Sequence, residues 1–219
     1  YEITRWLEFR RVLFRSNTIK VAKDVIGIRE GYNTFGTMHI LNTQKGIFYI
    51  ADTLINRHPD QDVLVDIAKL SAGTVKFFNE EPVMAMLSYS NFGTDAQGSP
   101  VKVKNAVDAM QKEFPDLAID GEMQVNYALN KQLRDEKYPF SRLKGKDVNT
   151  LVFPNLSSAN GAYKLLQALS PEAEIICPIQ MGLNKPIHFT DSESSVQDIV
   201  NITAVAVIDA YVEKIKNNK

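Results

Sequence analysis

The chain has 219 residues, of which 44% are hydrophobic and 23% are charged, with 11 Gly and 9 Pro. This composition is typical of a soluble globular protein and excludes an intrinsically disordered chain. The formal net charge of −1 offers no basic surface for a phosphate backbone or an anionic membrane, so we expect no nucleic acid and no membrane as partners. No apolar stretch approaches the ~20 residues that a membrane-spanning helix needs.

The first sixteen residues differ in composition from the rest of the chain. Residues 1–16 contain the only Trp and four Arg. The run resembles a translated sequencing adapter, and we expect the native sequence to start near Asn17. The alternative is a genuine amphipathic helix, because Ile3, Leu7 and Phe14 can share one face.

Helical and extended patterns alternate over the following hundred residues. Apolar spacing predicts a short helix over 18–27 that ends on a glycine. Two runs rich in β-forming residues, 37–41 and 47–51, flank turn residues and predict a hairpin. Pro59 and the residue after it open an amphipathic helix, which leads into an apolar strand over 83–89.

The same alternation continues to the end of the chain. We expect helices over 100–114, 122–134 and 158–169, and strands over 117–120, 149–153 and 174–179. A strand over 186–189 and a long helix from Ser195 to about Lys216 complete the pattern. Strands that alternate with helices of this length form βαβ units, so the expected fold is α/β with a mostly parallel sheet.

Titratable side chains do not form a recognisable metal or nucleophile motif. Cys177 is the only cysteine, which excludes a disulfide within the chain and fits a reducing cytoplasm. Its apolar surroundings in the sequence predict a buried structural thiol. His39, His58 and His188 lack the spaced companions of a metal site, so we expect no metal and no bound cofactor in this chain.

Polar loops that follow predicted strands are the candidate ligand sites. In open α/β sheets, ligands bind beyond the carboxyl ends of the strands, where helix N-termini favour anions. The segments 88–94, 155–160 and 185–195 occupy such positions. Each also has a simpler interpretation, because Ser, Asn, Asp and Gly are ordinary residues of loops and helix caps. We expect Asp120 and Glu122 to cap a helix rather than to catalyse.

Five motifs taken in order resemble the phosphate acetyl/butyryltransferase (phosphotransacetylase) family. They are SYSNFG (88–93), IDGEMQVNYAL (119–129), YPFSRLKGKDVNTLVFPNLSSANGAYKLLQ (138–167), PIQMGLNKPIHF (178–189) and SSVQDIVNITAVAVIDA (194–210). The YPFSRLKG and SSVQDIVN motifs are most similar to the version fused behind bacterial NADP-dependent malic enzymes. The resemblance covers essentially everything from Asn17 onward.

The resemblance implies a fold related to isocitrate dehydrogenase and shortened at its N-terminus, with two subdomains. Residues 17–30 and 180–219 would be what remains of the first subdomain. Residues 31–179 would form the second, which includes the hairpin.

The resemblance also implies which residues would act. Active family members transfer acetyl between CoA and phosphate, using a Ser that helps to deprotonate the CoA thiol and an Arg that holds phosphate. Asp191 and Ser192 align with that pair, Lys20 replaces a second Arg, and Asp198 retains a family Asp. Neither Ser nor Lys reproduces the bidentate grip of Arg on phosphate, so we expect the transferase activity to be lost.

The expected ligand is acetyl-CoA or another acyl-CoA, bound in a single cleft between the segments 88–94, 155–160 and 191–198. The residues that the resemblance assigns to acyl-CoA and phosphate are Ser88, Ser90, Asn91, Gly93, Asn155, Ser157, Asn160 and Asp198. The expected function is that of a regulatory and oligomerisation domain of an upstream malic enzyme, in which NADP and a divalent metal would belong to the malic enzyme part. The alternatives are an active acyl-CoA:phosphate transferase and a purely structural role. We expect a homo-oligomer.

Overall fold

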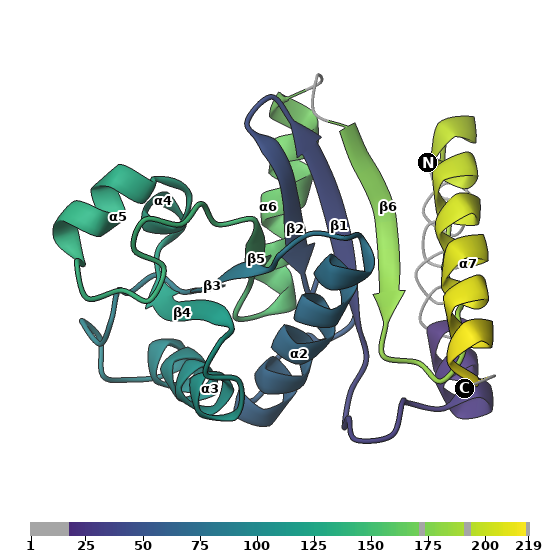
Figure 1. The fold of residues 1–219 in the computed structure, drawn as a ribbon, viewed down its shortest axis with the longest axis horizontal. Helices are drawn as coiled ribbons and strands as arrows, with labels where there is room; N and C mark the ends of the chain where they lie inside the picture. Colours follow the sequence, from purple (N-terminus) through teal and green to yellow (C-terminus); the bar gives the residue numbers. More distant parts are fainter. Residues whose placement is uncertain (1–17, 171–173, 191–193, 218–219) are drawn as a thin grey trace, which may run out of the picture.

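A six-stranded sheet organises the fold, and its strand order is β4-β3-β5-β2-β1-β6 (Figure 1). The computed structural model describes residues 18–170, 174–190 and 194–217. The strands are β1 (Gly36–Thr43), β2 (Gly46–Ala51), β3 (Val83–Leu87), β4 (Ala118–Met123), β5 (Thr150–Val152) and β6 (Glu174–Met181). Only β1 runs antiparallel to its neighbours, which confirms the predicted α/β fold with a mostly parallel sheet.

Helices cover both faces of this sheet. Residues 18–26 are helical, and the later helices are α2 (Gln61–Phe77), α3 (Ser99–Glu113), α4 (Val125–Leu129), α5 (Lys131–Lys137), α6 (Leu156–Leu169) and α7 (Val196–Asn217). The larger core lies on the face that α2, α3 and α7 cover. The smaller core lies on the opposite face, where Tyr163 of α6 and Ala128 of α4 pack on the sheet. No helix in these described ranges has the length and apolarity needed to cross a bilayer.

The helix α2 shows how the sequence forms the larger core. The side chain of Asp60 accepts a hydrogen bond from the N–H of Val63 at 2.9 Å and so caps the first turn. Leu64, Ile67 and Val75 are fully buried on one stripe of the helix. Burial of each such side chain stabilises the fold by about 1.5–3 kcal/mol. The predicted start and buried face of this helix are therefore confirmed.

The predicted hairpin is also confirmed, with a tighter turn. The ladder between β1 and β2 continues to the pair Thr43 and Gly46, which leaves only two residues in the loop. Gly46 has φ +118, a conformation that side chains rarely adopt. The hydroxyl of Thr43 donates to the carbonyl oxygen of Gly46 at 2.9 Å and closes the turn.

Two predicted elements are wrong. The helix expected over 122–134 starts later, because β4 continues to Met123, and it is divided at Asn130, whose side chain caps α5 by accepting from Leu133 N. The strand expected over 186–189 does not form. Instead, the Nδ1 atom of His188 accepts the N–H of Gln180 at 3.1 Å, on the edge of β6 where another strand would pair.

The strand directions place several loops at one edge of the sheet. Because β2, β3, β4 and β5 are parallel, and β6 shares their direction through the antiparallel β1, all five end at the same edge. We call this the carboxyl edge. Residues 1–17 and 191–193, which include Asp191 and Ser192, lie outside the described residues, as does the side chain of Cys177.

Candidate functional site

The loop after β3 is stabilised in part by hydrogen bonds within the loop itself. The N–H groups of Ser90, Asn91 and Thr94 donate to Ser88 Oγ at 3.4 Å, to Thr94 Oγ1 at 3.1 Å and to Asn91 O at 3.1 Å. Ser90 and Asn91 are 4% and 8% exposed. These groups hold the loop in shape rather than presenting donors to a ligand.

The end of β4 holds the same loop from the side. The buried carboxylate of Glu122 accepts the N–H of Gly93 at 2.7 Å, and Ser90 Oγ lies 3.3 Å from the same oxygen. Gln124 donates its N–H to Asn91 Oδ1 at 2.8 Å and its side-chain amide to the carbonyl oxygen of Tyr89 at 2.6 Å. The motifs around 88–93 and 119–129 are therefore two halves of one hydrogen-bonded unit.

Asp120 and Glu122 do not cap a helix, so that expectation is wrong. Both side chains are buried within β4. Asp120 accepts hydrogen bonds from Ser141 Oγ at 2.7 Å and from the N–H of Arg142 at 2.8 Å. Gly121 lies between them, where a Cβ would come within 2.5 Å of the carbonyl oxygen of Met86. The close approach of β3 and β4 therefore requires glycine there.

The entry to α6 contains both a cap and exposed polar groups. Asn155 Oδ1 accepts the N–H of Ser158 at 3.0 Å, which confirms the capping alternative for this side chain. Ser157 is exposed on the first turn. The side-chain amide of Asn160 makes only long contacts, at 3.4 Å, to Thr53 O and to Tyr163 Oη.

A polar cluster after β2 was missed by the sequence analysis. Asp52 is 3% exposed and accepts from the N–H and hydroxyl of Thr37 at 3.0 and 2.8 Å, and from the N–H and side-chain amide of Asn56, both at 2.7 Å. Leu54 and Ile55 donate their N–H groups to it as well. The available signal was an Asp directly after a strand, the same reasoning that singled out residues 88–94.

His39 lies beside this cluster as a neutral core histidine. Its Nδ1 is 2.8 Å from Thr53 Oγ1, and its ring stacks on Tyr163 with 4.1 Å between centroids. Burial, with a smaller contribution from the charge of Lys164, lowers the pKa of His39 to about 4. The imidazole is therefore uncharged near neutral pH and supplies no cation to an anionic ligand.

The turn before α7 is also a cap, and it lies apart from the other loops. The N–H and hydroxyl of Ser195 donate to Asp198 Oδ2, each at 2.8 Å, and the N–H of Asp198 donates back to Ser195 Oγ at 3.1 Å. Lys185, just past the carboxyl end of β6, pairs with Glu213, whereas Asp198 lies fifteen residues earlier on α7. At 1.5 Å per residue, Asp198 is about 22 Å along the helix from that contact.

The structure thus brings together two of the three expected segments. The loops after β3 and β5 follow adjacent strands, about 5 Å apart. Because α7 approaches the carboxyl edge with its C-terminal half, Asp198 lies toward the opposite edge, and the expectation of a single cleft for all three segments is wrong (Figure 1). Lys20 is exposed on the helix over 18–26. Among the described side chains, no group of three or more His, Cys, Asp or Glu is placed to hold a metal ion.

Comparison with known proteins identifies the family. The family model described as phosphate acetyl/butaryl transferase matches residues 12–207. The chain belongs to this family. Its fold matches the crystal structure of a phosphotransacetylase from Streptococcus pyogenes with a TM-score of 0.80 and 34% identity, over 89% of this chain and 58% of that chain.

Two kinds of relative resemble this family member to a similar degree. The NADP-dependent malic enzyme of Escherichia coli is 40% identical over 193 residues, which are 88% of this chain and 25% of the relative. A phosphate acetyltransferase of Clostridium acetobutylicum is 43% identical over 169 residues, 76% of this chain and 50% of the relative. The chain therefore spans about a quarter to half of these relatives.

Proposed function

We propose that this family member is an acyl-CoA-binding domain that regulates and assembles an NADP-dependent malic enzyme and has lost transferase activity of its own. The observation that carries the proposal is the retained family fold, combined with the expected alignment of Asp191 and Ser192 with the family's Ser and Arg. A carboxylate at 191 would repel the phosphate dianion, and Ser192 provides no cation to hold it. The similarity to malic enzymes supports the proposed setting.

The N-terminus of α3 is the best-supported place for the phosphates of CoA. Its N-cap is Gly98, so no side chain caps the first turn. The hydroxyl of Ser99 has no partner among the described residues. Free N–H groups at a helix N-terminus favour anions. The ammonium group of Lys102, one turn further on, donates to Pro59 O at 2.7 Å and to Pro154 O at 3.0 Å. A cation therefore stands between the loops after β2 and β5.

The loops after β3 and β5 would then shape the rest of the acyl-CoA site. Their adjacent strands place Ser88 and Gly93 on one side and Ser157 and Asn160 on the other. Ser90, Asn91 and Asn155 would act through loop shape, since their side chains already have partners within the protein. Asp198 belongs to the family resemblance only, because α7 carries it away from this edge.

The exposed apolar side chains of α7 support the proposal that this chain is part of a larger assembly. Its outward face carries Val196, Ile199, Val200, Val207, Ile208, Tyr211 and Ile215, all exposed. A helix that is apolar on every side is normally buried. We propose that further protein covers this face, in keeping with the division into a first subdomain (17–30 and 180–219) and a second (31–179), and that the assembly is a cytoplasmic homo-oligomer. NADP and the divalent metal would be bound by the malic enzyme part.

The second candidate is an active acyl-CoA:phosphate transferase. The similarity to the Clostridium acetobutylicum phosphate acetyltransferase favours it. Such an enzyme would need a different cation for phosphate than the family Arg.

One pair of measurements separates the candidates. Calorimetric titration of the chain with acetyl-CoA, and an assay of acetyl exchange between CoA and phosphate, should show saturable binding without exchange. Exchange well above background would establish the second candidate. Absence of acetyl-CoA binding would overturn both and leave a structural role.

A further inference from the structure

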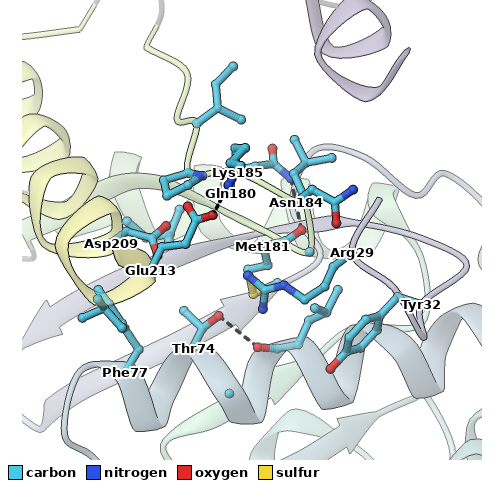
Figure 2. Close-up of a pocket in the computed structure, with 18 of the residues that line it drawn as sticks. Arg29, Tyr32, Thr74, Phe77, Gln180, Met181, Asn184, Lys185, Asp209 and Glu213 are labelled. Carbon is cyan, nitrogen blue, oxygen red and sulfur yellow. Dashed lines mark hydrogen bonds and ion pairs between the residues drawn. The ribbon is translucent and has the colours of Figure 1, made fainter. Parts of the chain in front are cut away.

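A cavity of about 470 Å³ lies between α2, the C-terminal half of α7 and the segment that follows β6 (Figure 2). Its volume falls within the range of small-molecule sites in proteins. The cavity borders β6, at the opposite side of the sheet from β3 and β4. It is therefore separate from the proposed acyl-CoA site.

Aliphatic side chains form part of the cavity wall, alongside polar and charged groups. Leu70 comes from α2, Met181 from β6, and Val205 and Val212 from α7. The hydroxyl of Thr74, which also lines the cavity, is engaged with the carbonyl oxygen of Leu70 at 2.9 Å. This aliphatic part of the wall can contact a short aliphatic chain of a ligand.

Four of the five charged side chains that line the cavity face an opposite charge or an imidazole. These contacts join Lys185 with Glu213 at 2.5 Å, Lys69 with Glu113 at 2.7 Å, and Asp209 with the Nε2 atom of His188 at 3.6 Å. The fifth charged side chain is Arg29, whose guanidinium has no ion pair or hydrogen bond in the part of the chain that the structure describes. Because Lys69 and Lys185 are already paired, Arg29 is the cation of the lining that remains for a ligand, which suits a ligand with a single negative charge.

Arg29 is well placed to hold such a ligand. Its N–H donates to the carbonyl oxygen of Gly182 at 2.9 Å, next to a bridge between Ile28 and Leu183. Figure 2 shows its side chain extending into the cavity from this anchored backbone. A guanidinium binds a carboxylate through two parallel hydrogen bonds.

A glycine in α2 keeps the cavity open. Gly73 lies inside the helix and lines the cavity, and a Cβ at this position would meet no atom within 4 Å. Glycine within a helix is less favourable than alanine. The cavity therefore keeps its volume beside Gly73, although a side chain at this position would make the helix more stable.

We propose that this cavity binds a small organic monocarboxylate with a short aliphatic chain. Arg29 holds the carboxylate, and the aliphatic chain lies along Leu70, Val205 and the surface over Gly73. Inorganic phosphate should bind more weakly, because it lacks the aliphatic chain and brings a second negative charge toward Asp209 and Glu213.

Pentanoate is the probe, and its binding to the whole chain is measured by ligand-detected NMR titration. Gly73→Leu fills the cavity and should weaken pentanoate binding by at least about tenfold, whereas Gly161→Leu should leave it unchanged. Gly161 is the matched control, because it is also inside a helix with nothing within 4 Å of its Cβ, but on α6 across the sheet. Leucine favours helix at both positions, so neither change is expected to unfold the protein.

A second pair of variants tests the charge. Arg29→Gln should weaken pentanoate binding by about tenfold, the effect of losing hydrogen bonds from a charged group. Lys45→Gln removes one charge at the exposed hairpin turn and should leave binding unchanged. Acetate should bind more weakly than pentanoate. Absence of saturable pentanoate binding, equal binding of inorganic phosphate, or retained binding in Gly73→Leu would each overturn the proposal.

Discussion

The buried carboxylate of Glu122 accepts the backbone N–H of Gly93 at 2.7 Å and so joins the end of β4 to the loop after β3. Glu122 has no exposed surface, and its Oε2 atom has no partner among the described residues. Two donors of the loop, the N–H of Gly93 and the hydroxyl of Ser90, therefore share one carboxylate oxygen. This shared acceptor makes Glu122 a sensitive test of the hydrogen-bonded unit.

Glu122→Ala should lower the free energy of unfolding by about 1–3 kcal/mol, because it leaves the N–H of Gly93 without its acceptor inside the protein. Glu122→Gln keeps an oxygen at the same place and should lose less. Urea denaturation measures both. Glu136→Gln, on the exposed side of α5, is the control and should be neutral. Equal stability of the alanine variant and the wild type would contradict the role of Glu122.

The cap of α6 and its exposed neighbour should respond differently. Asn155→Ala should cost about 1 kcal/mol of stability, since the N–H of Ser158 loses its partner. Ser157→Ala should leave stability unchanged but weaken acetyl-CoA binding about threefold, the effect of one neutral hydrogen bond. Thermal denaturation and calorimetry give the two quantities. If Ser157→Ala binds acetyl-CoA as the wild type does, this end of α6 has no part in the site.

His39 should make the protein less stable in mild acid. The pKa of its imidazole is about 4 in the folded protein and 6.5 in the unfolded chain. At a pH between these two values, the imidazole is protonated in the unfolded chain and neutral in the folded protein. Stability should therefore fall as pH drops from 6.5 to about 4, by a total on the order of 3 kcal/mol. Urea denaturation at several pH values measures this. In His39→Asn the dependence on pH should be shallower, and an unchanged slope would show that other groups cause it.

The alignment of Asp191 and Ser192 with the family Ser and Arg can be tested by restoring that pair. Asp191→Ser together with Ser192→Arg should strengthen binding of inorganic phosphate by about tenfold or more, because a carboxylate is removed and a guanidinium is added. Calorimetric titration with phosphate measures the gain. Asp191→Ser alone separates the loss of repulsion from the new contact. No gain in the double variant would show that the alignment is wrong.

Local signals explain which parts of the fold were predictable. The cap at Asp60 and the apolar stripe behind it define α2 without reference to the rest of the chain, and the hairpin has turn residues between two β-rich runs. Helix formation was predicted from residue 122 onward because the sequence there is helical in pattern. Contacts of Glu122 with a loop thirty residues away keep it in a strand instead.

The candidate site was predictable to a similar extent. Loops that follow strands in βαβ units must lie at one edge, so the proximity of 88–94 and 155–160 followed from the pattern. The position of Asp198 did not, because the connection from Met181 to α7 is long enough to return along the sheet before the helix begins. No spacing rule reveals that path. The side-chain partners of Asp52 could not be predicted from the sequence either, since they depend on the pairing of β1 with β2.

The His188 side chain on the edge of β6 has a consequence for assembly. An uncovered outer strand can pair with a strand of another molecule and start aggregation. Here an imidazole nitrogen occupies the Gln180 N–H on that edge, and α7 packs alongside, with Val205 buried in the same core as Ile179. His188 and α7 therefore cover the outer edge of the sheet. A chain cut before residue 186 would leave β6 open to cross-β association with its own copies.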